Sequence, residues 1–181
     1  MNKGLRRFYG LMGSLQKRHL FLMFVILMMG VPVVLAGCRS ENYKIDLEAE
    51  KKEVEKVIHI SIGWAKNKDL AGLYQVIAND TGYLEVDPDD RIVRGFHDFK
   101  KAEDFWMSPD FKAIRYEIRD LVIRFSKQGD IAWFFCLLDD INQWKGHPAN
   151  WENTRWTGVL EKQNGQWVIV QMHFSFAFKE K

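Results

Sequence analysis

The chain of 181 residues is poor in cysteine and proline, with two of the first and four of the second. Two cysteines cannot build the disulfide framework that many small secreted domains use. The five histidines are scattered without the spacing of a metal site, and the sequence contains neither a glycine-rich phosphate loop nor a serine nucleophile elbow. The sequence therefore predicts no metal site and no cofactor.

Acidic residues are missing from the first 37 positions, which carry five basic residues and a long apolar run. A charged start, an apolar stretch and small residues at its end are typical of a secretory signal peptide. The run closes on Leu35-Ala36-Gly37-Cys38, which resembles the lipobox of bacterial lipoproteins. In that family a peptidase cuts before the cysteine, which carries a lipid.

The lipobox resemblance implies a signal peptide over residues 1–37 and lipidation of Cys38. It also implies a chain anchored to the membrane of the bacterial cell envelope, with its domain outside the cytoplasm. An uncleaved anchor helix is the alternative, because the apolar run approaches the length that spans a bilayer.

Acidic residues slightly outnumber basic ones in the rest of the chain. Removing five positive charges from a net charge of +2 leaves the mature chain at −3, so we predict no nucleic-acid partner. The second cysteine, Cys136, lies in an apolar run, and we expect it to be a buried, inert thiol.

Residues 46–181 suit one small domain, joined to Cys38 by a polar tether over 38–45. Apolar residues recur at helical spacing from Ile45 to about Lys66, and Asp69 is typical of the N-cap of a shorter helix that ends near Ala78. We further expect a strand over 81–86, a solvated acidic turn over 87–91 and a third helix over 95–108.

Alternating apolar residues mark the last third of the chain. Residues 112–126 alternate but slip by one at Arg119-Asp120, which predicts a β-bulge and a bend in the sheet. A strand follows over 131–140, and Asn164-Gly165 is the strongest signal for a two-residue hairpin. Helices followed by sequential antiparallel strands predict an α+β fold.

This order of elements resembles the SnoaL-like division of the nuclear transport factor 2-like superfamily. The last hairpin carries most of the likeness, through Arg155, Thr157, Val159, Leu160, Trp167, Ile169, Val170, His173 and Ser175. It also resembles the association domain of calmodulin-dependent protein kinase, although Phe135 and Phe174 align with two pocket arginines of that domain.

The resemblance implies a cone-shaped, cystatin-like α+β fold over residues 46–181, with N-terminal helices packed on a curved antiparallel sheet. The concave face would leave a pocket, and the convex face would pair subunits. The resemblance does not imply one activity, because the superfamily contains isomerases, cyclases, dehydratases and binding domains.

Counting outward from Asn164-Gly165 places Thr157 opposite Met172 and Arg155 opposite Phe174, and we assign this face to the pocket. Alternation groups Trp133, Phe135, Leu137 and Asp139 of the preceding strand on one face, and the helices opposite add walls. The predicted ligand pocket comprises Arg155, Trp133, Phe135, Asp139, Met172, Phe174, Trp64 and Tyr74. A structural ion pair of Arg155 with Asp139 or Glu152 is the competing explanation.

Three functions stay open. An aromatic pocket with one arginine suits the binding of a small hydrophobic or acidic molecule. An enzyme of isomerase, cyclase or dehydratase type would use a pocket Asp, Glu or His as its base. The candidate residues are Asp80, Glu85, Asp139 and His173, with turn capping as the competing role of Asp80 and convex-face packing as that of His173.

The third open function is a ligand-free dimerisation or assembly module. Both faces of the last hairpin are too apolar to lie in water, so we expect a homodimer through the convex face of the sheet.

Overall fold

The computed structural model describes residues 45–178 of the chain. The predicted signal peptide over 1–37, the lipidation site Cys38 and the tether up to residue 44 lie outside the described residues. Between residues 45 and 178, no helix combines the length and hydropathy that crossing a bilayer requires.

Two helices open the described domain. α2 (Leu47–Gly63) begins after Asp46, whose carboxylate accepts hydrogen bonds from the backbone N–H groups of Glu48 and Ala49. A single 3₁₀ turn, η1 (Trp64–Lys66), extends it. α3 (Leu70–Val76) begins after Asp69, which accepts a hydrogen bond from the Gly72 N–H, so the predicted N-cap is confirmed.

A short hairpin and a broken helix follow. β1 (Leu84–Val86) pairs with β2 (Ile92–Arg94) across the acidic turn. The expected third helix is divided into α4 (Phe96–Phe99), the 3₁₀ turn η2 (Lys100–Ala102) and α5 (Glu103–Met107).

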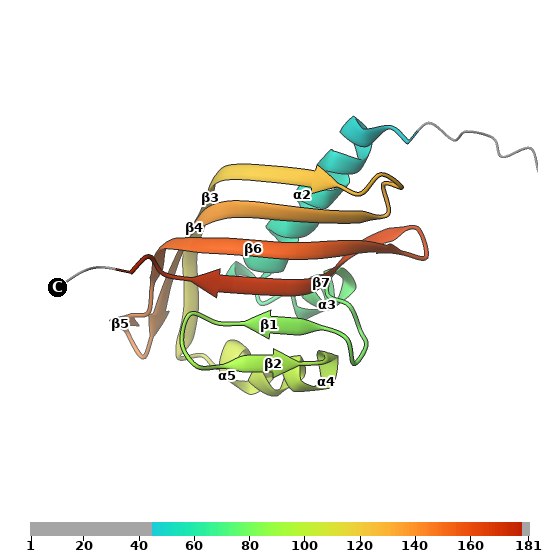
Figure 1. The fold of residues 1–181 in the computed structure, drawn as a ribbon. Helices are drawn as coiled ribbons and strands as arrows, with labels where there is room; N and C mark the ends of the chain where they lie inside the picture. Colours follow the sequence, from blue (N-terminus) through green and yellow to red (C-terminus); the bar gives the residue numbers. More distant parts are fainter. Residues whose placement is uncertain (1–44, 179–181) are drawn as a thin grey trace, which may run out of the picture. The chain divides into compact units, whose positions relative to one another are not determined.

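The sheet is completed by the second half of the chain. Its strands are β3 (Phe111–Phe125), β4 (Ile131–Trp144), β5 (His147–Pro148), β6 (Trp151–Gln163) and β7 (Gln166–Ser175). The strand order is β2-β1-β7-β6-β4-β3, with β5 paired to β4 (Figure 1). β1 lies parallel to β7, so the sheet is mixed rather than wholly antiparallel as predicted.

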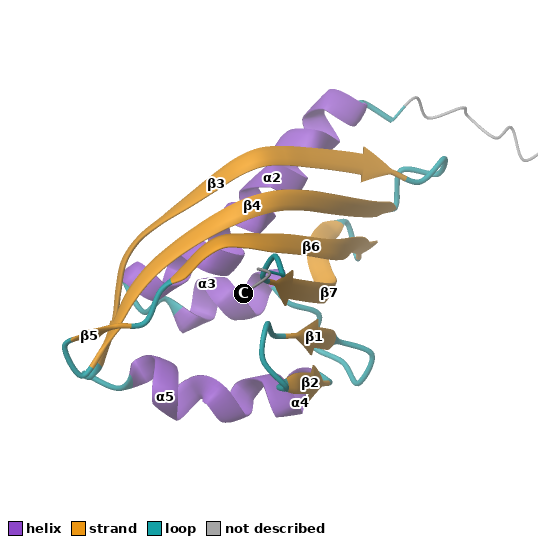
Figure 2. Ribbon diagram, turned by 60° about the vertical axis from the view of Figure 1, so that its left-hand side comes forward, coloured by secondary structure: helices purple, strands orange, loops and turns teal. Residues whose placement is uncertain are grey.

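The sheet curves around the helices, which lie on its concave side (Figure 2). The predicted bulge is present, since the register of β3 on β4 shifts between Arg119 and Val122, and Asp120 adopts a positive φ of 54°. The core between helices and sheet includes Val54 and Ile58 of α2 and Trp156 and Leu160 of β6. The predicted α+β fold, with helices packed on a curved sheet, is therefore confirmed.

A second irregularity, in the last hairpin, was not predicted. Gln163 pairs with Gln166 and Leu160 with Ile169 as counted, but Val159 pairs with Gln171 instead of Val170, which leaves Val170 as an extra residue on β7. Beyond this bulge every partner moves by one position.

The shifted register reverses the predicted faces. Arg155 lies opposite Ser175 rather than Phe174, and Trp156 lies opposite Phe174. The Trp156 and Phe174 rings stack with centroids 5.4 Å apart. Met172 and Phe174 therefore face the helices while Arg155 faces outward, and the prediction that the three share one face is wrong.

Candidate functional site

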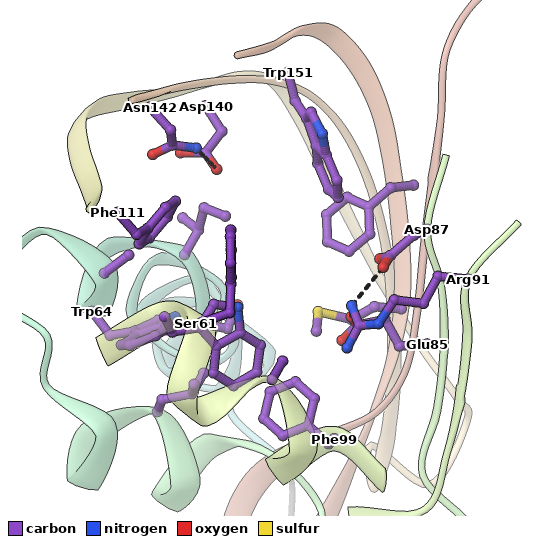
Figure 3. A pocket seen from close by; sticks show the side chains of 18 of the residues that line it. Ser61, Trp64, Glu85, Asp87, Arg91, Phe99, Phe111, Asp140, Asn142 and Trp151 are labelled. Carbon is purple, nitrogen blue, oxygen red and sulfur yellow. Dashed lines mark hydrogen bonds and ion pairs between the residues drawn. The ribbon is translucent and has the colours of Figure 1, made fainter. Parts of the chain in front are cut away.

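A cavity of about 530 Å³ lies between the concave face of the sheet and the helices. Its walls are mainly apolar, and the lining residues come from α2, η1, α3, β1, α4, η2, α5, β3, β4, β6 and β7 and from the β1–β2 turn. The aromatic residues are Trp64, Phe99, Phe105, Trp106, Phe111, Trp151 and Phe174. Polar side chains gather at two places on this wall, one on the β1–β2 hairpin and one on β4, and Ser61 of α2 is a further polar lining residue (Figure 3).

The first polar group follows from the alternation of β1 and the residues beside it. Tyr83, Glu85 and Asp87 are two residues apart, so their side chains point to the same side of the sheet, where all three are buried. The Tyr83 hydroxyl donates a hydrogen bond to Glu85 Oε2 across 2.6 Å. Glu85 is only 5% exposed although it is ionisable, which makes it the most unusual residue of the cavity wall.

Arg91 supplies the positive charge beside these carboxyl groups. Its Nη1 lies 2.6 Å from Asp87 Oδ2 and 3.6 Å from Glu85 Oε1. The turn that carries it is fixed by Asp89, which accepts a hydrogen bond from the Arg91 N–H across 2.9 Å. Arg91 therefore balances one of two neighbouring carboxylates.

Burial raises the pKa of Glu85 to about 7. The hydrogen bond from Tyr83 opposes this rise, the Asp87 carboxylate adds to it, and Arg91 lowers the pKa again. The Tyr83 hydroxyl is held neutral, since its own burial and the neighbouring Glu85 raise its pKa far above the usual range. Glu85 is thus a carboxyl group that exchanges protons near neutral pH.

The second polar group lies where β4 passes the cavity. Asp140 and Asn142 continue the inward positions of Cys136 and Leu138, because strand alternation holds to the end of β4. Asn142 Nδ2 donates a hydrogen bond to Asp140 Oδ2 across 2.7 Å. Burial raises the pKa of Asp140, and the hydrogen bond from Asn142 lowers it in part.

Three of the predicted pocket residues line this cavity, namely Trp64, Met172 and Phe174. Trp64 lies against Trp106, with ring centroids 5.4 Å apart. Tyr74 does not line the cavity, because its ring packs against Phe96 and its hydroxyl donates a hydrogen bond to Glu103.

The other four predicted pocket residues lie on the outer face of the sheet. Trp133 and Phe135 are 46% and 38% exposed, since the alternation of β4 points Ala132 and Phe134 inward instead. Asp139 forms an ion pair with Arg119 across 3.0 Å. Arg155 is exposed and donates a hydrogen bond to the Phe176 carbonyl, so it pairs with neither Asp139 nor Glu152 in the described domain.

The other candidate catalytic residues lie away from the cavity. Asp80 is exposed and accepts a hydrogen bond from the Gly82 N–H, a turn role. His173 is exposed on the outer face, opposite Thr157. Cys136 is fully buried, and this burial raises the pKa of its thiol to about 12. Among residues 45–178 no cluster of three or more His, Cys, Asp or Glu side chains is placed to hold a metal ion.

Six polar residues of the cavity were not recognised in the sequence as site residues: Ser61, Asp87, Asp89, Arg91, Asp140 and Asn142. Glu85 was named only as a candidate base. The alternation of Tyr83, Glu85 and Asp87 was visible, but the acidic run after it indicated a solvated turn. Only the packing of the hairpin against the helices shows that these side chains point inward.

The domain is therefore an α+β protein in which helices cover the concave face of a curved, mixed sheet and enclose a cavity. A family model described as a SnoaL-like domain matches residues 54–179, and the chain belongs to that family. A comparison with curated proteins gave no match.

Several solved structures have the same fold at low sequence identity. A putative dehydratase of the NTF2-like family from Streptomyces avermitilis matches with a TM-score of 0.63 and 15% identity, covering 74% of this chain and 99% of that one. A putative calmodulin-dependent kinase II association domain from Exiguobacterium sibiricum matches with a TM-score of 0.60 and 10% identity, covering 73% and 96%. These likenesses show the fold alone.

Proposed function

We propose that the protein is a lipid-anchored domain of the bacterial cell envelope that binds a small, largely hydrophobic molecule in its cavity. The observation that carries this proposal is the cavity itself, about 530 Å³ in volume, with mostly apolar walls rich in aromatic rings and polar groups gathered in a few places. This combination of apolar walls and few polar groups is typical of small-molecule sites.

The charged residues of the cavity favour a hydrophobic ligand over an acidic one. The carboxyl groups of Glu85, Asp87, Asp89 and Asp140 line it, whereas Arg91 is the one basic residue among the described lining residues. Because Arg91 is already paired with Asp87, an acidic ligand would meet uncompensated carboxylates. We therefore favour the hydrophobic ligand over the acidic one.

Native mass spectrometry of the full chain, released from its own membrane in mild detergent, tests the binding proposal. We expect a co-purifying small molecule on the wild type and its loss in Ala65→Phe, because Ala65 lines the cavity and a phenyl ring would fill it. Ala71→Phe is the matched control, since Ala71 is exposed on α3. An empty wild-type protein, or a ligand retained in Ala65→Phe, would contradict the proposal.

The lipid anchor rests on the lipobox, which lies outside the described residues. In the producing bacterium, Cys38→Ser should abolish incorporation of labelled palmitate, while Cys136→Ser should leave it unchanged. Undiminished labelling of Cys38→Ser would remove the lipid anchor from the proposal but leave ligand binding untouched.

One observation favours a second function, an enzyme of isomerase, cyclase or dehydratase type. Glu85 faces the cavity with a pKa raised to about 7, a value suited to a general base or acid at neutral pH. Such an enzyme should exchange an acidic C–H proton of a bound carbonyl compound with D₂O, and Glu85→Gln should stop this exchange. Exchange that is equal in the wild type and in Glu85→Gln would rule out Glu85 as the base.

We also propose that the outer face of the sheet pairs with a second copy of the chain. Val122, Trp133 and Phe135 are apolar side chains exposed there, and they surround a shallow depression beside Gly158. Exposed apolar side chains that cluster on one face often mark a protein–protein contact. The self-association would leave the cavity, on the opposite face, open to its ligand.

A further inference from the structure

The strongest unexplained feature of the cavity is the side chain of Asn142. It is 6% exposed, yet its Oδ1 atom is buried without a hydrogen-bond partner in the described part of the chain. Its Nδ2 atom is engaged by Asp140 across 2.7 Å, which fixes the orientation of the amide because a carboxylate accepts and the NH₂ group donates. A buried acceptor without a donor is costly, so a donor from outside the chain would stabilise it.

Asp140 lies beside this atom and lacks a cation. None of the ion pairs formed within residues 45–178 includes Asp140, and its one described hydrogen bond comes from Asn142. The one basic residue among the described lining residues, Arg91, belongs to the hairpin group and is paired with Asp87. The β4 side of the cavity thus combines a partly buried carboxyl group with a buried acceptor that lacks a hydrogen-bond partner in the described part of the chain (Figure 3).

The walls around this pair are aromatic. Trp151 and Phe111 are labelled near Asp140 and Asn142 in Figure 3, and Trp64 lines the same cavity. The faces of aromatic rings attract cations, most strongly those of tryptophan. Carboxylate, carbonyl oxygen and aromatic rings are all complementary to one chemical group, a protonated amine.

We propose that the cavity binds an organic amine, whose ammonium group donates a hydrogen bond to Asn142 Oδ1 and forms an ion pair with Asp140, while its apolar part lies against the aromatic wall. This inference rests on the proposed function, since it names the class of molecule that the cavity holds. In this arrangement the β4 side of the cavity binds the charged group of the ligand. The hairpin side, with Tyr83, Glu85 and Arg91, takes no part in binding that group.

Three probes that share one indole ring test the inference by isothermal titration calorimetry on the full chain in detergent: tryptamine, tryptophol and indole-3-acetate. We expect tryptamine to bind roughly tenfold or more tightly than tryptophol, and indole-3-acetate to bind most weakly. Quaternised N,N,N-trimethyltryptamine lacks the N–H donors and should bind several-fold more weakly than tryptamine.

Two variants locate the recognition. Asp140→Asn should lower the affinity for tryptamine roughly tenfold, to about the affinity for tryptophol. The affinity for tryptophol itself should not change. Asp139→Asn is the matched control. The Asp139 carboxylate lies next to Asp140 in the chain but on the outer face of the sheet, paired with Arg119, so this variant should leave all affinities unchanged. The comparison of probes on the wild type decides the question even if Asp140→Asn fails to fold.

Equal affinities for the three probes, or tightest binding of tryptophol or indole-3-acetate, would overturn the amine inference and leave the cavity as a ligand site. An unchanged affinity of folded Asp140→Asn for tryptamine would also overturn it. If none of the probes binds, the amine inference fails, and the proposed function fails with it only if native mass spectrometry finds the wild-type cavity empty.

Discussion

Tyr83 and Glu85 lie two residues apart on the same side of the sheet, and the tyrosine hydroxyl donates a hydrogen bond to the carboxyl group across 2.6 Å. Both side chains are almost completely buried. A buried carboxyl group with a donor on one side and the Asp87 carboxylate on the other has opposing influences on its charge. Burial is the largest of them, and it raises the pKa of Glu85.

Glu85→Gln should make the stability of the domain less dependent on pH. Because the folded pKa of about 7 lies above the ordinary value of 4.5, Glu85 favours folding fully below pH 4.5, and this contribution falls as the pH rises through 7. Glutamine is neutral at every pH, so the variant does not lose this contribution. Relative to the wild type, the unfolding free energy of Glu85→Gln should therefore rise by about 3 kcal/mol between pH 4 and pH 8.

Urea unfolding at several pH values measures this shift. Glu117→Gln is the control, since Glu117 is a half-exposed carboxylate on β3 and its removal should give no such pH dependence. A difference between Glu85→Gln and wild type that stays constant from pH 4 to pH 8 would show that ionised Glu85 is not penalised in the fold.

Glu50→Gln should weaken the attachment of α2 to the last hairpin. Glu50 accepts a hydrogen bond from Lys162 across 2.5 Å and one from the Trp167 indole across 2.6 Å. Lys162 is the main reason that the pKa of Glu50 is lowered, so its contribution to stability is present above pH 4.5 and is lost as the pH falls through the folded pKa.

We expect a loss of about 1 kcal/mol for Glu50→Gln at pH 7, because the pair is partly exposed to solvent. Denaturant unfolding at pH 7 and pH 3 would show the loss at the higher pH and a smaller one at the lower. Glu53→Gln, on the exposed face of the same helix, should change little at either pH. An equal loss for both variants would mean that the contacts with Lys162 and Trp167 contribute nothing specific.

Gly158→Ala should destabilise the sheet. A Cβ atom at this position would lie 2.5 Å from a carbon of the Phe134 ring and 2.8 Å from the Gln171 carbonyl oxygen. Crowding of this kind in a packed sheet costs about 1 to 3 kcal/mol. Thermal unfolding should therefore show a lower midpoint for Gly158→Ala than for Gly82→Ala, whose Cβ would meet only the Asp80 side chain. Equal midpoints would contradict the crowding seen around Gly158.

Trp133→Glu should convert the proposed dimer into a monomer. Trp133 is 46% exposed on the outer face, and a charge there would have to be buried without a partner on self-association. Sedimentation of the full chain at micromolar concentration should show a dimer for the wild type and for Met107→Glu, a control on α5 away from this face. A monomeric wild type would contradict the dimer.

Residue pattern alone predicted the elements that depend on neighbours in the chain. The caps at Asp69, the hairpin turn at Asn164-Gly165 and the slip at Arg119-Asp120 were each predicted from a few adjacent residues, and each is present. These features are local, because a cap, a two-residue turn or a change of alternation is fixed by the residues that form it.

Tertiary structure decided what faces the cavity. The extra residue Val170 on β7 turned Arg155 outward, and no local signal marks that bulge. β1 found its place parallel to β7 through long-range pairing, which brought Glu85 beside Met172 and turned an apparently solvated acidic segment into part of a buried wall. The residue pattern alone was enough to predict the fold class and the long strands of the second half of the chain. The short strands β2 and β5 and the polar residues of the cavity were not predicted. Which side chains face the cavity depends on strand registers that only packing sets, since a shift of one residue exchanges the two faces of a strand.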